Sequence, residues 1–300
     1  MNTNSTAAKV ALVEQIYVPY PPHIEFHEAA KFLIELGIAT RGMPQKGLRV
    51  LAPSGSGKTA AATALVRIIH EKYPRTSTRV PVVNVSLDRA CTARKLMVSI
   101  LEKFGDYYAS SGNEQALKSR VKRCFQSLGT VLLIIDEIQH INYQVSVMND
   151  VTDSLKRLLD DGVVPIVFMG TEEAEGLFTR NIQLSSRLLP PCDLHPLDLK
   201  SPRDRNLFAG YVTLLDEAIV ANKILPSLSG LNDAEILECL FLMSDGVFGR
   251  VSRLLPTVVK QVLLRGGARI EREDLASAVD SWAIANNICR TNPFYRGGRR

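Results

Sequence analysis

Two short stretches of the sequence carry groups that could act on a phosphate ester. The first is the loop Ala52–Thr59, Ala-Pro-Ser-Gly-Ser-Gly-Lys-Thr, which follows the apolar residues Leu48, Val50 and Leu51 and precedes the helix-forming run 60–69. Glycines let successive N–H groups of such a loop turn toward phosphate oxygens, and the following helix adds partial positive charge at its N-terminus. We therefore expect a phosphate-binding loop, and the expected nucleotide-binding residues are Ser54, Gly55, Ser56, Gly57, Lys58, Thr59 and Ala60.

Two residues of the loop have tasks of their own. Lys58 is expected to reach the β- and γ-phosphates, and the Thr59 hydroxyl is expected to bind Mg²⁺, a cation that prefers oxygen ligands. Ala52 stands where the loop pattern usually has its first glycine, but the strand and helix patterns on either side compensate for this departure. The sequence thus predicts binding of ATP and Mg²⁺, and the alternative is a Gly/Ser turn beside a surface lysine.

The second stretch is the apolar run Val131–Ile135 followed by Asp136 and Glu137. Such a run is typical of a central parallel strand, and ligands of open α/β sheets bind beyond the carboxyl ends of the strands. We expect Asp136 to hold Mg²⁺ through water and Glu137 to orient and polarise the water that attacks the γ-phosphate. The alternative is a solvated loop that happens to begin with two acids.

The elements that must position these residues alternate between strand and helix patterns. Alternation of this kind predicts a mostly parallel sheet, and beyond residue 200 only helical patterns remain. The expected strands are 48–52, 80–86, 131–136, 163–170 and 192–197, and the expected later helices are 203–222, 233–243, 250–264 and 272–286. The predicted division is an N-terminal extension (1–45), a nucleotide-binding domain (46–200), a helical lid (201–286) and a basic tail (287–300).

The composition agrees with a globular protein. The 300 residues are 46% hydrophobic, which is enough for one large core and a smaller one. No stretch reaches the ~18 to 20 apolar residues that span a bilayer, and residues 1–9 lack the apolar region of a signal peptide, so we expect a cytoplasmic protein without a membrane partner. Five dispersed cysteines and five histidines show no metal-ligand spacing.

Several features together resemble the AAA+ ATPase pattern over about residues 45–285. They are the phosphate-binding loop, the strand that ends at Asp136, the run Met169–Thr171 after the fourth strand, and a lid beginning near Gly246. The resemblance implies an α/β fold, namely a three-layer αβα P-loop domain with a parallel five-stranded sheet and a small C-terminal helical lid. It also implies that Thr171 is the polar sensor that contacts the γ-phosphate or the attacking water.

The same resemblance assigns roles to two arginines. The segment Asn181–Arg187 resembles the stretch that donates an arginine finger to the nucleotide of the neighbouring subunit, so Arg187 is the first candidate and Arg180 the second. The segment Gly246–Arg250 resembles the second sensor, whose arginine reaches the phosphates from the lid. Arg250 is the candidate there, with Arg253 as an alternative. For each arginine the plain alternative is a solvated surface charge.

Within AAA+ proteins the sequence most resembles the TniB family of transposition ATPases, related to TnsC and MuB. The features that carry this resemblance are the segment Tyr17–Pro21, the run Asp136–His140 and the compact lid with its short tail. The resemblance implies that ATP-bound subunits assemble as a ring or helical filament on duplex DNA and recruit or activate a DDE transposase, with ATP hydrolysis driving disassembly. It also allows a TniQ-like targeting protein as a further partner.

A basic segment supports contact with DNA. Residues 89–123 contain eight Lys or Arg residues and three acids. Such a segment can follow a phosphate backbone, and because no base-reading motif is present, we expect binding to be independent of sequence. The candidate contacts are Arg94, Lys118 and the loop 110–112 with Ser111. The alternative is an ordinary solvated helix face.

Two other functions remain open at this point. One is an ATP-gated loader or remodeller of a replication helicase, which predicts a stable complex with a helicase. The other is a signalling-type nucleotide switch without DNA binding, which predicts hydrolysis that is indifferent to DNA.

Overall fold

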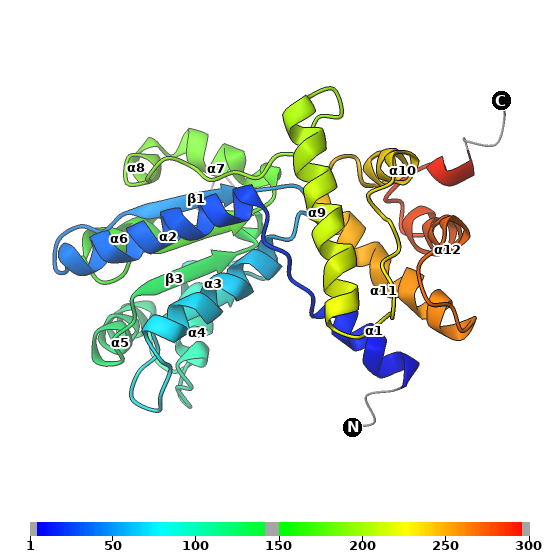
Figure 1. Ribbon diagram of the computed structural model, residues 1–300. Helices are drawn as coiled ribbons and strands as arrows, with labels where there is room; N and C mark the ends of the chain where they lie inside the picture. The colour runs from blue at the N-terminus through cyan, green and yellow to red at the C-terminus, as the bar shows by residue number, and fades with distance from the viewer. Residues whose placement is uncertain (1–4, 142–149, 296–300) are drawn as a thin grey trace. The chain divides into compact units, whose positions relative to one another are not determined.

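The computed structural model describes residues 5–141 and 150–295. The chain divides into two compact units, which are described separately below (Figure 1). One unit, here the α/β unit, comprises Pro22–Ser54 and Lys58–Leu194. The other, here the helical unit, comprises Met1–Pro21, Gly55–Gly57 and His195–Arg300.

The α/β unit is built around a parallel sheet with helices on both faces (Figure 1). The strands are β1 (Gly47–Leu51), β2 (Val82–Ser86), β3 (Leu132–Asp136) and β4 (Ile166–Gly170), in the order β1-β4-β3-β2. The helices are α2 (Pro21–Ala39), α3 (Lys58–Lys72), α4 (Ala93–Lys103), α5 (Glu114–Ser127), α6 (Asp150–Asp160), α7 (Glu175–Arg180) and α8 (Ile182–Ser185), with short 3-10 turns η1 (Ile138–His140) and η2 (Glu172–Ala174).

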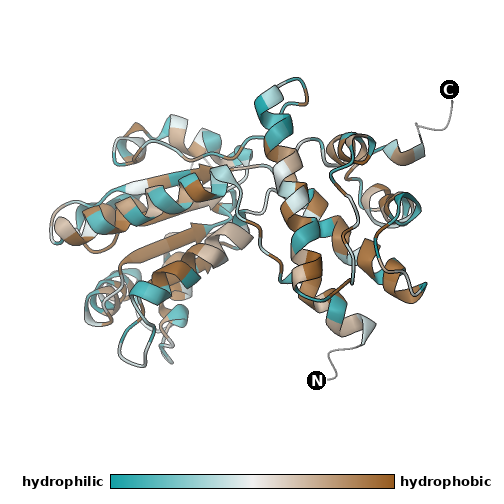
Figure 2. Cartoon of the chain, in the orientation of Figure 1, coloured by the Kyte–Doolittle hydropathy of each residue, from teal (hydrophilic) through white to brown (hydrophobic). Residues whose placement is uncertain are grey.

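Alternating side chains of each strand pack into different cores. Ile134 of β3 belongs to one buried cluster with Leu33 of α2 and Leu65 of α3. Its neighbours Leu133 and Ile135 belong to a second cluster, formed with residues of α4, α5 and α6. Burial on both faces is why β3 and β4 are apolar up to the acidic end of β3, whereas β1 and β2 each carry a half-buried polar residue, Arg49 and Asn84. Figure 2 shows that the helices carry both hydrophobic and hydrophilic residues. The expected three-layer arrangement is confirmed.

The prediction of a fifth strand at 192–197 is wrong, because the described residues form a sheet of four strands. The chain at 187–194 nevertheless runs beside β1 and exchanges hydrogen bonds with it. They join Gly47 N to Arg187 O (3.0 Å), Leu189 N to Gly47 O (2.8 Å), Cys192 N to Arg49 O (2.9 Å) and Leu194 N to Leu51 O (2.7 Å).

Two features of this segment prevent a regular ladder. Pro190 and Pro191 have no N–H group to donate. In addition, the Leu51 N–H donates to the side-chain oxygen Oδ1 of Asp193 at 2.8 Å instead of to a backbone carbonyl. The other oxygen of this carboxylate pairs with the Arg49 guanidinium, so the side chain fixes the segment to β1 in place of strand pairing.

The strands end together at one edge of the sheet. Leu51 pairs with Gly170, and Ile135 pairs with Phe168. Because all strands are parallel, the residues that follow β1, β3 and β4 leave the sheet at the same edge. This is the edge at which the sequence places the phosphate-binding loop, the acidic pair and Thr171.

The helical unit contains helices in the predicted region beyond residue 200. They are α9 (Pro202–Ala221), α10 (Ala234–Ser244), α11 (Phe248–Leu264) and α12 (Arg272–Ala278), continued by a π-helical turn (Val279–Ile284) and a 3-10 turn (Pro293–Tyr295). Ser201 caps α9, where Pro202 fits the first turn, and Asp233 caps α10. The four predicted helices are confirmed, except that the last turn of the fourth is irregular.

The N-terminal residues belong to the helical unit. Helix α1 (Thr6–Glu14) packs against α11, and the extended segment that follows brings the Tyr20 ring to 3.8 Å from the Phe248 ring, centre to centre. Within the described residues 5–141 and 150–295, no helix is long and apolar enough to cross a membrane. The residues 296–300 of the predicted basic tail lie outside the described residues.

Candidate functional site

The loop between β1 and α3 has the backbone that phosphate binding requires at its glycines. Gly55 and Gly57 have φ values of 87° and 88°, a left-handed conformation that a residue with a side chain rarely adopts. Helix α3 begins at Lys58, whose side chain is 7% exposed. Its Nζ donates to the carbonyl oxygens of Ala52 (2.6 Å) and Pro53 (3.2 Å), so the ammonium group faces the loop.

Thr59 and Asp136 lie together, as a shared metal site would require. The Thr59 hydroxyl donates to Asp136 Oδ2 at 3.3 Å, and Asp136 is 6% exposed. Both groups are hard oxygen donors, which suits Mg²⁺. No cluster of three or more His, Cys, Asp or Glu side chains occurs in the part of the chain that the structure describes, so a metal bound here needs further oxygens from water or a ligand.

Glu137 sits at a sharp turn between β3 and η1. Its φ and ψ are 59° and 39°, a left-handed conformation that is unfavourable for a residue with a side chain. Its N–H donates to Asp136 Oδ1 at 2.8 Å, which stabilises this conformation. One oxygen of its carboxylate accepts a hydrogen bond from the Gln139 amide.

The Gln139 side chain connects the acidic pair with the end of β4. Its Oε1 accepts the Thr171 N–H at 3.0 Å, while its Nε2 donates to Glu137. The Thr171 hydroxyl oxygen is buried and has no hydrogen-bond partner within residues 5–141 and 150–295. The structure thus brings Lys58, Thr59, Asp136, Glu137 and Thr171 to one edge and adds Gln139, which sequence reasoning missed. The only available signal was its place in the run Asp136–His140.

Arg187 makes a bidentate ion pair within its own chain. Its Nε and Nη2 donate to the two carboxylate oxygens of Asp160 at 2.6 and 2.9 Å, and Nη1 donates to Gln183 O. Hydrogen bonding to Asp160 raises the pKa of the guanidinium above its ordinary value. The Arg187 backbone lies next to Gly47 at the start of β1, whereas the phosphate-binding loop follows the end of β1. Arg187 is therefore not a ligand of the loop in its own chain.

The other arginine candidates differ in their surroundings. Arg180 ends α7, is exposed, and has no ion-pair partner among the residues that the structure describes. Arg250 lies in the first turn of α11, and its Nη1 donates to the Ser244 carbonyl at 3.0 Å. Arg253 is exposed on the same helix.

The candidate DNA contacts surround the loop 105–113 between α4 and α5. Arg94 does not offer a free guanidinium: its Nη1 and Nη2 donate to the carbonyls of Gly112 and Ser110, both at 2.6 Å. Arg120 likewise donates to the carbonyls of Tyr108 (2.9 Å) and Ser111 (2.5 Å).

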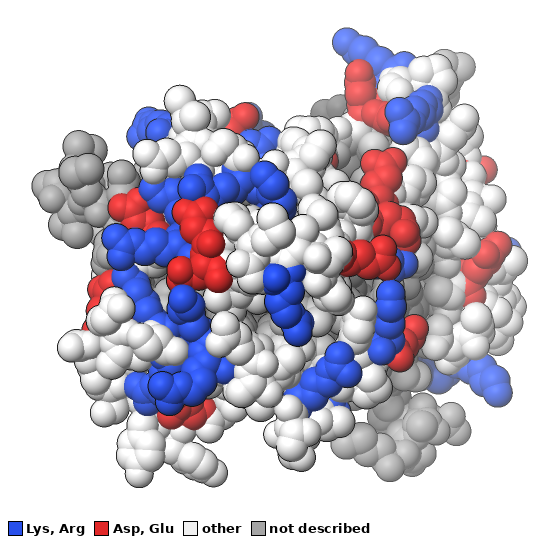
Figure 3. All heavy atoms as spheres, turned by 90° about the vertical axis from the view of Figure 1, so that its left-hand side faces the viewer, with Lys and Arg blue, Asp and Glu red and all other residues white. Residues whose placement is uncertain are grey.

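The remaining groups near this loop divide into paired and unpaired ones. Lys118 forms an ion pair with Glu114. Tyr107 is 100% exposed and Tyr108 is 73% exposed. Lys103, at the end of α4, is exposed and has no ion-pair partner among the residues described. On the face drawn in Figure 3, Lys and Arg side chains gather in several patches with Asp and Glu between them.

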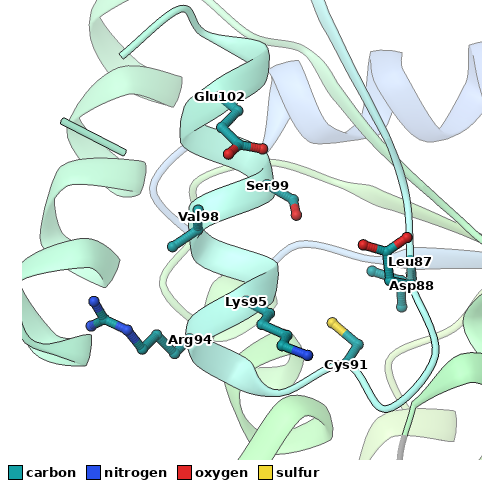
Figure 4. A pocket seen from close by; sticks show the side chains of 8 residues that line it. All are labelled: Leu87, Asp88, Cys91, Arg94, Lys95, Val98, Ser99 and Glu102. Atoms are coloured by element: carbon teal, nitrogen blue, oxygen red, sulfur yellow. The ribbon is translucent and has the colours of Figure 1, made fainter. Parts of the chain in front are cut away.

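A pocket of about 290 Å³ lies beside α4, lined by residues 87–102. Figure 4 shows that Lys95 and Cys91 point toward each other, whereas Arg94 points to the other side of α4. Arg94 is the only predicted site residue in its lining. Lys58, Thr59, Asp136, Glu137 and Thr171 do not line this pocket, although the Leu87 N–H of its lining donates to the Asp136 carbonyl at 3.0 Å.

A comparison with models of known protein families shows the family of this chain. The model of the bacterial TniB protein matches residues 15–194, which include the loop, the acidic pair, Thr171 and Arg187. The chain belongs to the TniB family. The resemblance found in the sequence is thereby confirmed, and the family is one of transposition-associated AAA+ ATPases. Arg250 lies outside the matched residues. A search of curated proteins finds no match.

Solved structures share the AAA+ fold with this TniB-family chain. The ORC2 protein of Aeropyrum pernix in ADPNP-ADP complexes is 14% identical and covers 90% of this chain and 71% of its own, with a TM-score of 0.65. The ORC1 protein of the same organism in complex with DNA is 18% identical and covers 91% and 69%, with a TM-score of 0.61. Domain III of the Thermotoga maritima replication initiation protein DnaA is 13% identical and covers 90% and 96%, with a TM-score of 0.54. At these identities the likeness shows the fold alone.

Proposed function

We propose that this chain is a Mg²⁺-dependent ATPase whose ATP-bound subunits assemble on duplex DNA and recruit or activate a DDE transposase. The observation that carries the proposal is the meeting of Lys58, Thr59, Asp136, Glu137 and Thr171 at one edge of the sheet. Membership of the TniB family supports the transposition context.

Each residue of this edge has a task in hydrolysis. When ATP binds, the Lys58 ammonium group leaves the carbonyl oxygens of Ala52 and Pro53 and binds phosphate oxygens instead. The N–H groups of the loop bind the same phosphates. Thr59 and Asp136 hold Mg²⁺, which neutralises the phosphate charge. Glu137 orients the attacking water, and the unpartnered hydroxyl of Thr171 supplies a hydrogen bond to the γ-phosphate or to that water.

An arginine from the neighbouring subunit completes the site. Arg187 is the first candidate, and it must release Asp160 to reach another chain. Such a guanidinium stabilises charge on the transferring phosphoryl group, an effect worth ~10³ to 10⁵ in rate in enzymes that use it. Because this contact depends on the γ-phosphate, ATP stabilises a ring or filament and hydrolysis releases its subunits. Arg250 is proposed to sense the nucleotide from the helical unit.

We propose the loop 105–113 as the part of the chain that contacts DNA. Arg94 and Arg120 satisfy the carbonyls of this loop and thereby fix its shape, so little conformational entropy is lost on binding. The loop presents Tyr107 and Tyr108 to solvent, and the exposed Lys103 beside it forms no ion pair with any residue that the structure describes. Backbone recognition of this kind is independent of DNA sequence.

The roles proposed for Arg94 and Lys118 change accordingly. Arg94 acts by holding the loop, with its own charge adding to the field near the phosphates. Lys118 reaches a phosphate only by leaving Glu114. Ser111 remains a candidate contact through its hydroxyl, because its N–H donates to the Tyr108 carbonyl and its own carbonyl accepts from Arg120.

The first experiment measures binding of the purified protein to a random-sequence duplex with ATP, ADP or no nucleotide, over a series of salt concentrations. Tight, salt-sensitive binding that requires ATP is expected. Lys58→Ala should weaken nucleotide binding and abolish assembly, whereas Glu137→Gln should bind ATP and prolong the assembly. Binding that ignores the nucleotide, or no binding at all, would favour the signalling-switch alternative. A stable helicase complex would favour the loader alternative.

A pair of matched variants tests the DNA-contacting loop. Lys103→Ala should weaken DNA binding and reduce the slope of log K against log salt by about 1, because one phosphate contact is lost. Lys31→Ala is the control, since Lys31 lies on α2, which packs on the opposite face of the sheet from α4. If the two variants bind DNA equally well, Lys103 is not a DNA contact.

A further inference from the structure

The side-chain amide of Gln139 has only one orientation that satisfies both of its neighbours. An ionised carboxylate can only accept hydrogen bonds, and a backbone N–H can only donate. The amide therefore turns its NH₂ group to Glu137 and its oxygen to the Thr171 N–H, the latter at 3.0 Å. If the amide were reversed, its oxygen would face the Glu137 carboxylate oxygen, and its NH₂ group would face the Thr171 N–H, so neither hydrogen bond could form.

The surrounding structure fixes the amide in this place. Ile138 and His140 anchor η1 on either side of Gln139: Ile138 is fully buried, and His140 Nδ1 lies 2.8 Å from the Leu87 carbonyl. At Gly170, a Cβ atom would lie 2.7 Å from Gln139 Oε1 and 2.6 Å from Ile138 Cγ2. The absence of a side chain at position 170 thus provides the space that the Gln139 amide occupies.

We propose that Gln139 is a positioning residue that orients the Glu137 carboxylate for hydrolysis and couples it to the Thr171 backbone at the end of β4. One Glu137 oxygen is occupied by Gln139, so the other is directed to the attacking water. The proposal rests on the proposed role of Glu137 and goes beyond it, because Gln139 itself touches neither water nor phosphate in this scheme.

The coupling has a mechanical consequence. Thr171 follows β4, whereas Glu137 follows β3, and the Gln139 amide spans the two strand ends. A shift of the β4 end that moves the Thr171 N–H must move the amide and, with it, the Glu137 carboxylate. Contact of Thr171 with the γ-phosphate is thereby transmitted to the residue that orients water.

The test compares Gln139→Leu, which has similar size and no polar atoms, with the native chain and with Gln126→Leu, the same change at an exposed position on α5. Gln139→Leu should lower kcat by about 10²-fold, as expected for a misplaced reacting group, and leave KM and ATP affinity within about twofold. Gln139→Glu keeps an acceptor for the Thr171 N–H but loses the donor to Glu137, and it should lose kcat to at least the same extent. Gln126→Leu should behave as the native chain.

A double-variant cycle separates positioning from a general structural role. If Gln139 acts through Glu137, adding Gln139→Leu to Glu137→Gln should lower the residual rate no further. Native kcat in Gln139→Leu, a loss confined to ATP affinity, or an equal additional loss in the Glu137→Gln background would each overturn the proposal. Failure of the parent function gives a different result, because Glu137→Gln would then hydrolyse ATP at the native rate.

Discussion

The proposed arginine finger, Arg187, is held by an ion pair with Asp160 in its own chain. A substitution of Asp160 that releases Arg187 therefore tests the proposal. Two nitrogen atoms donate to Asp160, at 2.6 and 2.9 Å, and Nη1 donates to Gln183 O. The guanidinium must therefore give up three hydrogen bonds before it enters another subunit's site. Asp160→Asn removes the negative charge that competes with phosphate for Arg187. If Arg187 is the finger, this substitution should therefore favour ATP-dependent assembly.

The size of the effect follows from the exposure of the pair. The Arg187 and Asp160 side chains are 28% and 43% exposed, so water screens their attraction. Exposed pairs contribute ~0.2 to 1 kcal/mol, and the bidentate geometry places this pair near the upper end. About 1 kcal/mol corresponds to roughly a fivefold change in an equilibrium constant. Asp160→Asn should lower the protein concentration at half-assembly by up to about fivefold.

Sedimentation velocity with a non-hydrolysable ATP analogue measures this concentration directly. Arg187→Ala should raise it and also reduce the ATPase rate per subunit, and Arg180→Ala tests the second candidate in the same way. Asp161→Asn is the matched control, because the neighbouring Asp161 pairs with Lys122. If Asp160→Asn impairs assembly as Arg187→Ala does, the pair is a structural link and the reasoning about Arg187 is refuted.

Three further predictions concern stability. Asp216 is 5% exposed and accepts hydrogen bonds from the N–H groups of Ser229–Leu231. Asp216→Ala should therefore lower the free energy of unfolding, measured by urea denaturation, by about 3 to 5 kcal/mol. Asp216→Asn should lower it by less. Gly170→Ala should cost about 1 to 3 kcal/mol in the same assay and also lower kcat, because the new Cβ displaces the Gln139 amide. Burial lowers the pKa of His27 in the folded protein, so His27 binds a proton more readily in the unfolded chain than in the folded one. The free energy of unfolding should therefore fall as the pH decreases below about 6.5. His27→Gln should make this decline shallower.

The sequence predicted the elements whose signal is local. The run Val131–Ile135 is apolar because β3 is buried on both faces, and its acidic end follows from the parallel arrangement of the strands. The lid helices α9 and α10 begin at residues that cap them, so their starts could be found within one or two positions. Each of these predictions depended on neighbours in the sequence.

Elements that depend on distant partners were predicted less well. The fifth strand failed because Pro190 and Pro191 interrupt the ladder and Asp193 replaces a backbone acceptor. Residues 1–45 were predicted as an N-terminal extension, whereas the described part of it contains two helices, α1 and α2, and α2 begins at Pro21. Proline is well tolerated in the first turn, because its missing N–H group would have no intrahelical partner there.

The hydrogen-bond partners of the arginines could not be predicted from the sequence either, because these partners are distant along the chain. Arg187 was recognised by its segment, yet its pairing with Asp160 joins residues 27 positions apart. Arg94 was predicted to contact DNA from its place in the basic segment 89–123, whereas its hydrogen bonds to Ser110 O and Gly112 O make it a support for the loop 105–113. Charge predicts that a guanidinium will find an acceptor, but only the fold determines which acceptor lies within reach.

The residues that follow β1, β3 and β4 form one connected hydrogen-bond network. Asp136 receives the Thr59 hydroxyl and the Glu137 N–H, and Gln139 continues the connection from the Glu137 carboxylate to the Thr171 N–H. Thr171 therefore contributes two separate groups: its N–H fixes the amide, and its hydroxyl is left for a ligand. Because the oxygens proposed to bind Mg²⁺ and the carboxylate proposed to orient water belong to the same chain of hydrogen bonds, we expect a change at the end of β4 to reach Glu137 without any rearrangement of the sheet.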